Sequence, residues 1–184
     1  MIFQDPMTCL NPFMKIGDQL IEPLTLHKGL AKGPARAQAM ALLDEVGIRD
    51  PQAAMSAFPH EFSGGMRQRV MIAMALINEP KLLIADEPTT ALDVTIQAQI
   101  LKLIAELQTT RDIGVLFISH DLAVVSDIAD QIVVMEKGLV VEQGQPKQIF
   151  DNPQHPYTQK LLAAIPSGQK AAGTVAPEPL IRID

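Results

Sequence analysis

The chain has 184 residues, of which 47% are hydrophobic and 20% are charged, so it has the balance of a globular protein with a packed core. The formal net charge of −6 argues against a nucleic-acid backbone as the main partner. A single cysteine, Cys9, excludes a disulfide within the chain and fits a reducing compartment. No apolar run in the sequence is long enough to span a bilayer.

The first part of the chain has the pattern of helices with polar outer faces, over residues 10–60. One of these helices is expected to stop at Gly47, and its apolar residues recur at helical spacing: Ala39, Leu42, Leu43 and Val46. A further helix is predicted over residues 63–78, after a Ser-Gly-Gly turn and before Pro80.

The second part of the chain alternates short apolar runs with helical patterns. We expect strands at 81–85 and 115–118, each buried on both faces, helices at 94–110, 122–129 and 156–165, and two strands around a turn within 132–142. This alternation predicts an α/β fold with βαβ units and a largely parallel sheet. From residue 166 onward, Pro, Gly and Ala dominate and predict a mobile tail.

Two adjacent carboxylates, Asp86 and Glu87, end the apolar strand in LLIADEPTTALD, residues 82–93. Side chains at the carboxyl end of a parallel strand face the crevice in which α/β proteins bind ligands. Asp86 there suits a nucleotide-bound Mg²⁺, and Glu87 suits the orientation of an attacking water. The pattern alone is equally typical of strand-end acids that cap a loop, with Pro88 ending the strand.

The segment EFSGGMRQRV, residues 61–70, places Ser63, Gly64 and Gly65 immediately before a helix. Ser63 is a good N-cap, the glycines leave backbone N–H groups accessible, and the helix N-terminus adds partial positive charge. These features suit an anion. Taken by itself, however, the segment favours an ordinary capped helix after a flexible turn.

Two polar residues gain meaning only in combination with these segments. His120 follows the predicted strand VLFIS, and Gln4 follows the apolar residues Ile2 and Phe3. Alone, each indicates no more than a polar residue at a strand end. No HExxH or CxxC pattern is present, so the histidines and the cysteine do not indicate a metal site.

Together and in order, these segments closely resemble the ATP-binding subunits of ABC transporters, and among them the oligopeptide and dipeptide (peptide/nickel) permease ATPases of bacteria. IFQDPMTCLNP resembles the Q-loop, FSGGMRQRV the signature motif, LLIADEP the Walker B strand, TTALD the D-loop and FISHD the H-loop. NPQHPYTQKLLAAIP resembles the segment after the core in the peptide-permease group. Phe62 and Met66 stand where many members have Leu and Gln. Five ordered motifs are far more specific than any one of them.

The resemblance spans residues 1–166 and implies a partial P-loop NTPase core, with a largely parallel sheet and an inserted helical subdomain. The helical subdomain would cover about residues 13–75, and the segment from Walker B to the H-loop would cover residues 80–150. Residues 167–184 would form the tail.

The resemblance also implies roles for residues around the chain's own nucleotide. Gln4 would sense the γ-phosphate, Mg²⁺ and the attacking water, and Asp86 would serve the Mg²⁺. Glu87 would be the general base, and His120 would hold the γ-phosphate and steady the water. The implied cofactors are ATP and Mg²⁺.

Other implied roles involve partners. Ser63, Gly64 and Gly65 would contact ATP held by a second ATPase subunit in a head-to-tail dimer, and Asp93 would couple the two sites. Transmembrane permease subunits would be direct partners, and a periplasmic or extracellular peptide-binding protein an indirect one. The protein would lie peripherally on the cytoplasmic face of the cell membrane.

The phosphate-binding pattern GxxxxGK[ST] does not occur in the 184 residues, and GLAKGPARA has the wrong spacing for it. The resemblance would place this loop upstream of Met1, which implies an N-terminally truncated ATPase that binds ATP weakly by itself. One alternative is therefore an inert or partner-dependent half-site protein. Another is an ABC ATPase of a soluble system, against which DPMTCLNP and HPYTQKLL argue.

Overall fold

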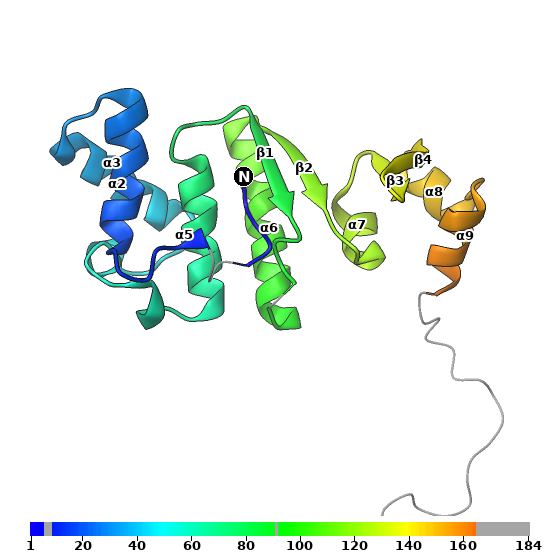
Figure 1. Cartoon of the computed structure of the whole chain (residues 1–184), viewed down its shortest axis with the longest axis horizontal. Helices are drawn as coiled ribbons and strands as arrows, with labels where there is room; N and C mark the ends of the chain where they lie inside the picture. Colours follow the sequence, from blue (N-terminus) through cyan, green and yellow to red (C-terminus); the bar gives the residue numbers. More distant parts are fainter. Residues whose placement is uncertain (6–8, 91, 165–184) are drawn as a thin grey trace, which may run out of the picture. The chain divides into compact units, whose positions relative to one another are not determined.

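The computed structural model describes residues 1–5, 9–90 and 92–164, and the chain divides into two compact units, Met1–Ile128 and Ala129–Asp184 (Figure 1). The predicted tail, residues 167–184, lies outside the described residues.

The first unit begins with a helical region. Helix α2 (Ile16–Lys28) packs against α3 (Lys32–Glu45), and the short elements α4 (Pro51–Ala54) and η1 (Pro59–Glu61) follow (Figure 1). The predicted stop after α3 is confirmed, because Gly47 has a φ of 80° and its N–H donates to the Asp44 carbonyl at 2.8 Å. This left-handed conformation is open to glycine at little steric penalty.

The remainder of the first unit alternates helix and strand. Its elements are α5 (Gly64–Leu76), β1 (Leu82–Asp86), α6 (Val94–Arg111), β2 (Gly114–Ile118) and α7 (Leu122–Ile128). Strands β1 and β2 pair in parallel, with α6 as the crossover helix between them (Figure 1). The predicted α/β fold class is therefore confirmed. Ile2 extends the pairing on the other side of β1 through a parallel bridge to Ala85.

A single apolar core holds these elements together. Fully buried side chains come from the helices and from β1, and include Leu20, Leu43, Ile72, Leu76, Leu83, Ile100 and Leu107. Burying each side chain of this size contributes about 1.5–3 kcal/mol relative to exposure. Ile2 is also completely buried, so the segment that carries Gln4 is anchored in the core.

The expectation that both strands are covered on both faces is wrong. Leu83 is fully buried, but its neighbour Leu82 is 54% exposed, and Leu116 and Ile118 of β2 are 51% and 44% exposed. In the described part of the chain, only one face of this sheet is buried. A continuous apolar run is typical of a two-sided strand, but it cannot show whether a second layer is present.

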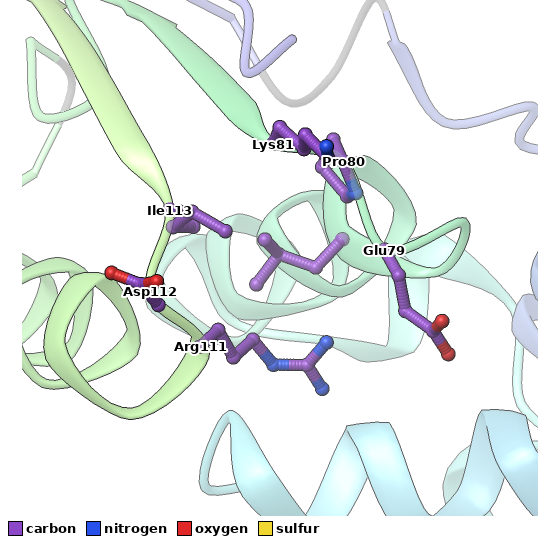
Figure 2. A pocket seen from close by; sticks show the side chains of 7 residues that line it. Glu79, Pro80, Lys81, Arg111, Asp112 and Ile113 are labelled. Carbon is purple, nitrogen blue, oxygen red and sulfur yellow. The ribbon is translucent and has the colours of Figure 1, made fainter.

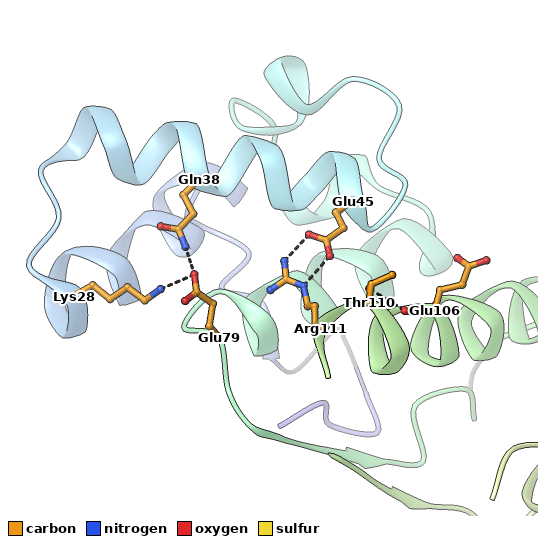
Figure 3. Close-up of polar contacts among 7 residues, drawn as sticks. All are labelled: Lys28, Gln38, Glu45, Glu79, Glu106, Thr110 and Arg111. Carbon is orange, nitrogen blue, oxygen red and sulfur yellow. Dashed lines mark hydrogen bonds and ion pairs between the residues drawn. The ribbon is translucent and has the colours of Figure 1, made fainter. Parts of the chain in front are cut away.

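Polar contacts tie α2 and α3 to the elements around the sheet (Figure 3). Glu79, between α5 and β1, lies 3.0 Å from the Lys28 ammonium and accepts from the Gln38 amide at 3.2 Å. Arg111, at the end of α6, donates from Nε to Glu45 at 2.7 Å and makes a second contact through Nη2. These contacts join the helical region to the rest of the first unit.

The second unit contains a hairpin and two helices. Strands β3 (Ile132–Glu136) and β4 (Leu139–Gly144) are antiparallel, as the sequence predicted. Lys137 and Gly138 have φ values of 51° and 82°, the left-handed pair that suits a two-residue hairpin turn. Helix α8 (Pro146–Asp151) was not expected, whereas α9 (Pro156–Ala163) was. None of the helices in the described residues is long and apolar enough to cross a membrane.

Candidate functional site

The parallel sheet brings Glu87 and His120 together. Asp86 ends β1 opposite Ile118, which ends β2, so the residues that follow both strands share one edge of the sheet. The Glu87 N–H donates to the Ile118 carbonyl at 3.0 Å. Nδ1 of His120 then lies 3.1 Å from Oε1 of Glu87.

Two further side chains bind the same carboxylate. Nε2 of Gln4 and Oγ1 of Thr90 each donate to Oε2 of Glu87 at 2.9 Å. The structure therefore groups three sequence-predicted residues, Gln4, Glu87 and His120. It adds Thr90, which the sequence analysis missed although its hydroxyl follows Glu87 by three positions, a spacing typical of a local hydrogen bond.

The surrounding donors favour the ionised form of Glu87. The hydrogen bond to His120 is the main cause that lowers the pKa of this carboxyl below its ordinary value of 4.5, and those from Thr90 and Gln4 act in the same direction. A carboxylate that is ionised at neutral pH can accept a proton. The Glu87 side chain is 24% exposed and that of His120 is 70% exposed, so the pair is accessible from solvent.

The backbone of Glu87 is held in an uncommon conformation. Its φ is 44°, in the left-handed region that residues with a side chain seldom adopt. Such a conformation costs about 1–3 kcal/mol and persists where the surroundings fix it. Here the bond to Ile118 precedes the turn, and the Thr90 N–H closes it by donating to the Glu87 carbonyl at 3.3 Å.

Asp86 is half-buried at the end of β1, and its N–H donates to the Ile2 carbonyl at 2.9 Å. The described residues contain no cluster of three or more His, Cys, Asp or Glu side chains that could hold a metal ion unaided. A Mg²⁺ that accompanies a nucleotide needs only one or two protein ligands, since phosphates and water supply the rest. The carboxylate oxygens of Asp86 and the amide oxygen of Gln4 are suitable as these one or two protein ligands.

The Ser-Gly-Gly turn begins α5, as the sequence predicted. The Ser63 hydroxyl accepts from the Met66 N–H at 3.4 Å, so Ser63 is the N-cap. A Cβ on Gly64 would lie 3.6 Å from Leu92, an ordinary contact, whereas one on Gly65 would lie 2.8 Å from Cγ2 of Ile96 on α6. Gly65 is therefore required for the packing of α5 on α6, and Gly64 is not.

A cavity of about 940 Å³ lies beside this turn. It is lined by residues 47–57 and 61–66, each in part, and by Arg69, Ile96 and Gln99. Arg69 donates to the Val46 carbonyl at 2.6 Å and thereby fixes one wall to α5. The accessible N-terminus of α5 thus borders a concave surface.

Asp93, the remaining predicted site residue, caps α6, because its Oδ1 accepts from the Ile96 N–H at 2.9 Å. The hydrogen bonds shown for Ser63 and Asp93 are local to their own helices. Among the described residues, the structure therefore groups Gln4, Glu87 and His120 but does not group Ser63 or Asp93 with them by hydrogen bonds.

A second pocket, of about 310 Å³, lies at the opposite ends of the strands (Figure 2). Its lining includes Pro80 and Lys81, which precede β1, and Asp112 and Ile113, which precede β2. Ligands of parallel α/β proteins bind outside the carboxyl ends of the strands, where Glu87 and His120 lie. This second pocket is therefore not the candidate nucleotide site.

Comparison with known protein families gives two matches along the chain. A family model for ABC transporters matches residues 1–90, and a model for the C-terminal region of oligopeptide/dipeptide transporters matches residues 141–180. The two models lie in the order that the sequence motifs imply.

Individual relatives agree with these matches. The chain is 56% identical over 186 residues to the glutathione import ATP-binding protein GsiA of Salmonella typhimurium, covering 100% of this chain and 30% of that protein. It is 57% identical to the dipeptide transport ATP-binding protein DppD of Bacillus subtilis, covering 90% of this chain and 50% of that protein. It is 58% identical to the oligopeptide transport ATP-binding protein OppD of the same organism, covering 91% of this chain and 47% of that protein.

Among solved structures, cbiO1 of Clostridium perfringens, part of an ABC transporter complex, matches with a TM-score of 0.72 and 31% identity, covering 90% of this chain and 63% of that one. The fold is thus that of an ABC ATPase core. The chain belongs to the ABC transporter family of ATP-binding proteins and resembles its peptide-import members. It spans between 30% and 50% of the length of these curated relatives.

Proposed function

We propose that the chain is the ATP-binding and ATP-hydrolysing part of a bacterial ABC importer for peptides, in which hydrolysis drives transport. The observation that supports this most directly is the Glu87 carboxylate, held by Gln4, Thr90 and His120 at the carboxyl ends of parallel strands. The names of the relatives, which refer to glutathione, dipeptides and oligopeptides, support peptides as the substrate class.

Glu87 is the proposed general base. Its ionised carboxylate takes a proton from the attacking water, the water oxygen bonds to the γ-phosphorus of ATP, and the bond to the β–γ bridging oxygen breaks, giving ADP and phosphate. His120, which is largely exposed, would donate a hydrogen bond to the γ-phosphate. Gln4 would position the water.

Asp86 and Gln4 are the proposed protein ligands of Mg²⁺. When bound, the ion supplies neutralisation of the phosphate charge. Asp86 is suited to this role because its backbone is fixed between Ile2 on one side and Ile118 of β2 on the other.

The Ser63-Gly64-Gly65 turn is the proposed contact to ATP held by a second ATPase subunit, in a head-to-tail dimer. Ser63 and Gly64 are exposed, and the N-terminus of α5 presents backbone N–H groups and partial positive charge to an anion. Asp93, whose carboxylate fixes the start of α6, is the proposed coupling residue between the two sites.

The remaining partners follow from the proposed importer. Transmembrane permease subunits would bind the ATPase directly at the cytoplasmic face of the membrane. A periplasmic or extracellular peptide-binding protein would deliver the substrate and act through them.

The test is ATP hydrolysis by the protein as its own cells make it, purified with its membrane subunits and reconstituted in vesicles. We expect Mg²⁺-dependent phosphate release that rises when a peptide-loaded binding protein is added. A complex that assembles but releases no phosphate under these conditions would contradict the proposal.

A second candidate is a partner-dependent half-site protein, without hydrolysis of its own. It is supported by the Ser63-Gly64-Gly65 turn, whose first two residues are exposed at the start of α5. The test is to mix the chain with a complete homologous subunit. Stimulated phosphate release that is lost in Gly64→Asp, which places negative charge at the turn, would support it. No stimulation would contradict it.

A further inference from the structure

Gln68 lies on α5 and is almost completely buried, with 1% of its surface exposed. Its side-chain Nε2 donates to the Pro88 carbonyl at 2.6 Å. The bond joins the helix that begins with the Ser-Gly-Gly turn to the residue immediately after Glu87, across 20 positions of sequence. Within the sequence, the two ends of the bond lie in separate motifs.

A buried amide is unfavourable in a core unless it is hydrogen-bonded. Val70, Met71 and Ile72, which follow within one turn of α5, are apolar and buried, so an apolar residue of the same size would suit this space. The feature that a glutamine adds is the donor to Pro88. Gln68 therefore contributes by fixing the position of the Pro88 carbonyl, and not by filling volume in the core.

Fixing Pro88 also restricts Glu87. The proline ring sets its own φ, so a fixed Pro88 carbonyl restrains the peptide group between Glu87 and Pro88. Glu87 is the residue with a φ of 44°, which its surroundings must hold. Pro88 and Thr89 are buried as well, which leaves this loop little freedom to rearrange.

We propose that Gln68 is a positioning residue for catalysis, which holds the Glu87 carboxylate in register with Gln4, Thr90 and His120 through the Pro88 carbonyl. This inference rests on the proposed function in which Glu87 is the general base. It also gives α5 two roles in one chain, because Gly64 at its start faces the proposed partner site and Gln68, one helical turn later, supports the chain's own base.

The test compares Gln68→Met with Gln19→Met. Methionine has nearly the length of glutamine and no donor, so Gln68→Met removes the bond with little change in volume. Gln19 is the matched control, since it is 5% exposed and its amide also donates to backbone carbonyls, those of Asn11 and Met14. Both variants remove hydrogen bonds made by a buried side-chain amide. Only the Gln68 hydrogen bond reaches the loop after Glu87.

In the purified importer complex, we expect Gln68→Met to lower the kcat for ATP hydrolysis by about 10-fold to 100-fold, because small misplacements of catalytic groups have effects of this size. The KM for ATP should stay unchanged, because the Gln68 side chain is buried and not accessible to a ligand. Gln19→Met should keep the kcat of the unmodified protein. An unchanged kcat in a folded Gln68→Met variant, or an equal loss in Gln19→Met, would overturn the proposal.

A second readout does not require ATP hydrolysis. Hydrogen exchange of the Glu87 and Thr90 backbone N–H groups, which donate to the Ile118 and Glu87 carbonyls, reports how firmly this loop is held. We expect faster exchange of both groups in Gln68→Met and unchanged exchange in Gln19→Met. If the unmodified protein proves inactive but this faster exchange appears, the proposed function fails and the positioning inference stands. If the exchange rates are the same in both variants, the inference fails.

Should Gln68→Met not fold, Gln68→Asn provides the same test. Asparagine keeps a buried amide but is one methylene shorter, so it cannot span the distance to the Pro88 carbonyl. The expected direction of change in kcat and in the hydrogen exchange of the Glu87 and Thr90 N–H groups is the same, and unchanged exchange in this variant would also overturn the inference.

Discussion

Nδ1 of His120 lies 3.1 Å from Oε1 of Glu87, so the residues that follow two adjacent parallel strands form one pair. Gln4 reaches the same carboxylate from a segment that bridges the other side of β1. Three positions far apart in sequence therefore meet because Ile2, β1 and β2 run side by side in the same direction.

The pKa of Glu87 should depend on these donors in a defined order. Removing the largest of them in His120→Ala should raise the pKa toward 4.5, and Thr90→Val should raise it less. In the unmodified protein the lowered pKa of Glu87 adds to the free energy of unfolding. This contribution is fully present at a pH above the ordinary pKa of a glutamate, and it is lost as the pH falls through the lower pKa of the folded state. Carboxyl ¹³C titration by NMR measures both shifts, and an unaltered curve for His120→Ala would show that the pair does not form in solution.

The two glycines of the Ser-Gly-Gly turn should respond differently to alanine. Gly65→Ala places a methyl group 2.8 Å from Cγ2 of Ile96, whereas Gly64→Ala makes an ordinary contact at 3.6 Å. We expect Gly65→Ala to lower the free energy of unfolding by about 1–3 kcal/mol through overpacking, and Gly64→Ala to have no such effect. Urea denaturation measures the difference. Equal stability of the two variants would mean that α5 and α6 are less closely packed than described.

The ion pair between Arg111 and Glu45 should contribute modestly to stability (Figure 3). The Glu45 hydrogen bond raises the pKa of Arg111, and the same bond lowers the pKa of Glu45. Because the pair is partly exposed, we expect Arg111→Met to reduce the free energy of unfolding by only about 0.5–1 kcal/mol. Lys102→Met is the control, since its partner Glu106 is 3.7 Å away and both side chains are mostly exposed. A larger loss in the control would contradict this assignment.

The uncovered face of the sheet should promote self-association of the purified chain. Leu82, Leu116 and Ile118 are exposed there, and contiguous exposed apolar side chains favour association. We expect Leu116→Thr to reduce the mass observed by light scattering without loss of stability. Leu83→Thr, which alters a fully buried residue of the same sheet, should destabilise the fold instead. Association that persists in Leu116→Thr would place the contact elsewhere.

Local signals in the sequence predicted much of this structure. Ser63 caps α5, Gly47 ends α3 and the turn at Lys137 and Gly138 closes the hairpin, because each depends on backbone conformations that short segments specify. The proximity of Glu87 and His120 could also be predicted from the sequence, since parallel strands place their carboxyl ends together.

Features that depend on tertiary packing could not be predicted from local sequence signals. Thr90 and Gln68 are ordinary polar residues in sequence, and only the fold shows that one binds the Glu87 carboxylate and the other the Pro88 carbonyl. The exposure of Leu82 and Leu116 was missed because hydrophobicity indicates a preference for burial and not the layer that provides it.

The most direct test of the central claim is the rate of ATP hydrolysis by Glu87→Gln in the assembled importer complex. Glutamine keeps the size of Glu87 but cannot accept the proton of the attacking water. We expect phosphate release to fall by about 10²-fold to 10⁴-fold, the range for loss of a general base, while ATP still binds. Glu106→Gln, an exposed change on α6, should hydrolyse ATP at the unmodified rate. Hydrolysis by Glu87→Gln at that same rate would contradict the assignment of Glu87 as the base.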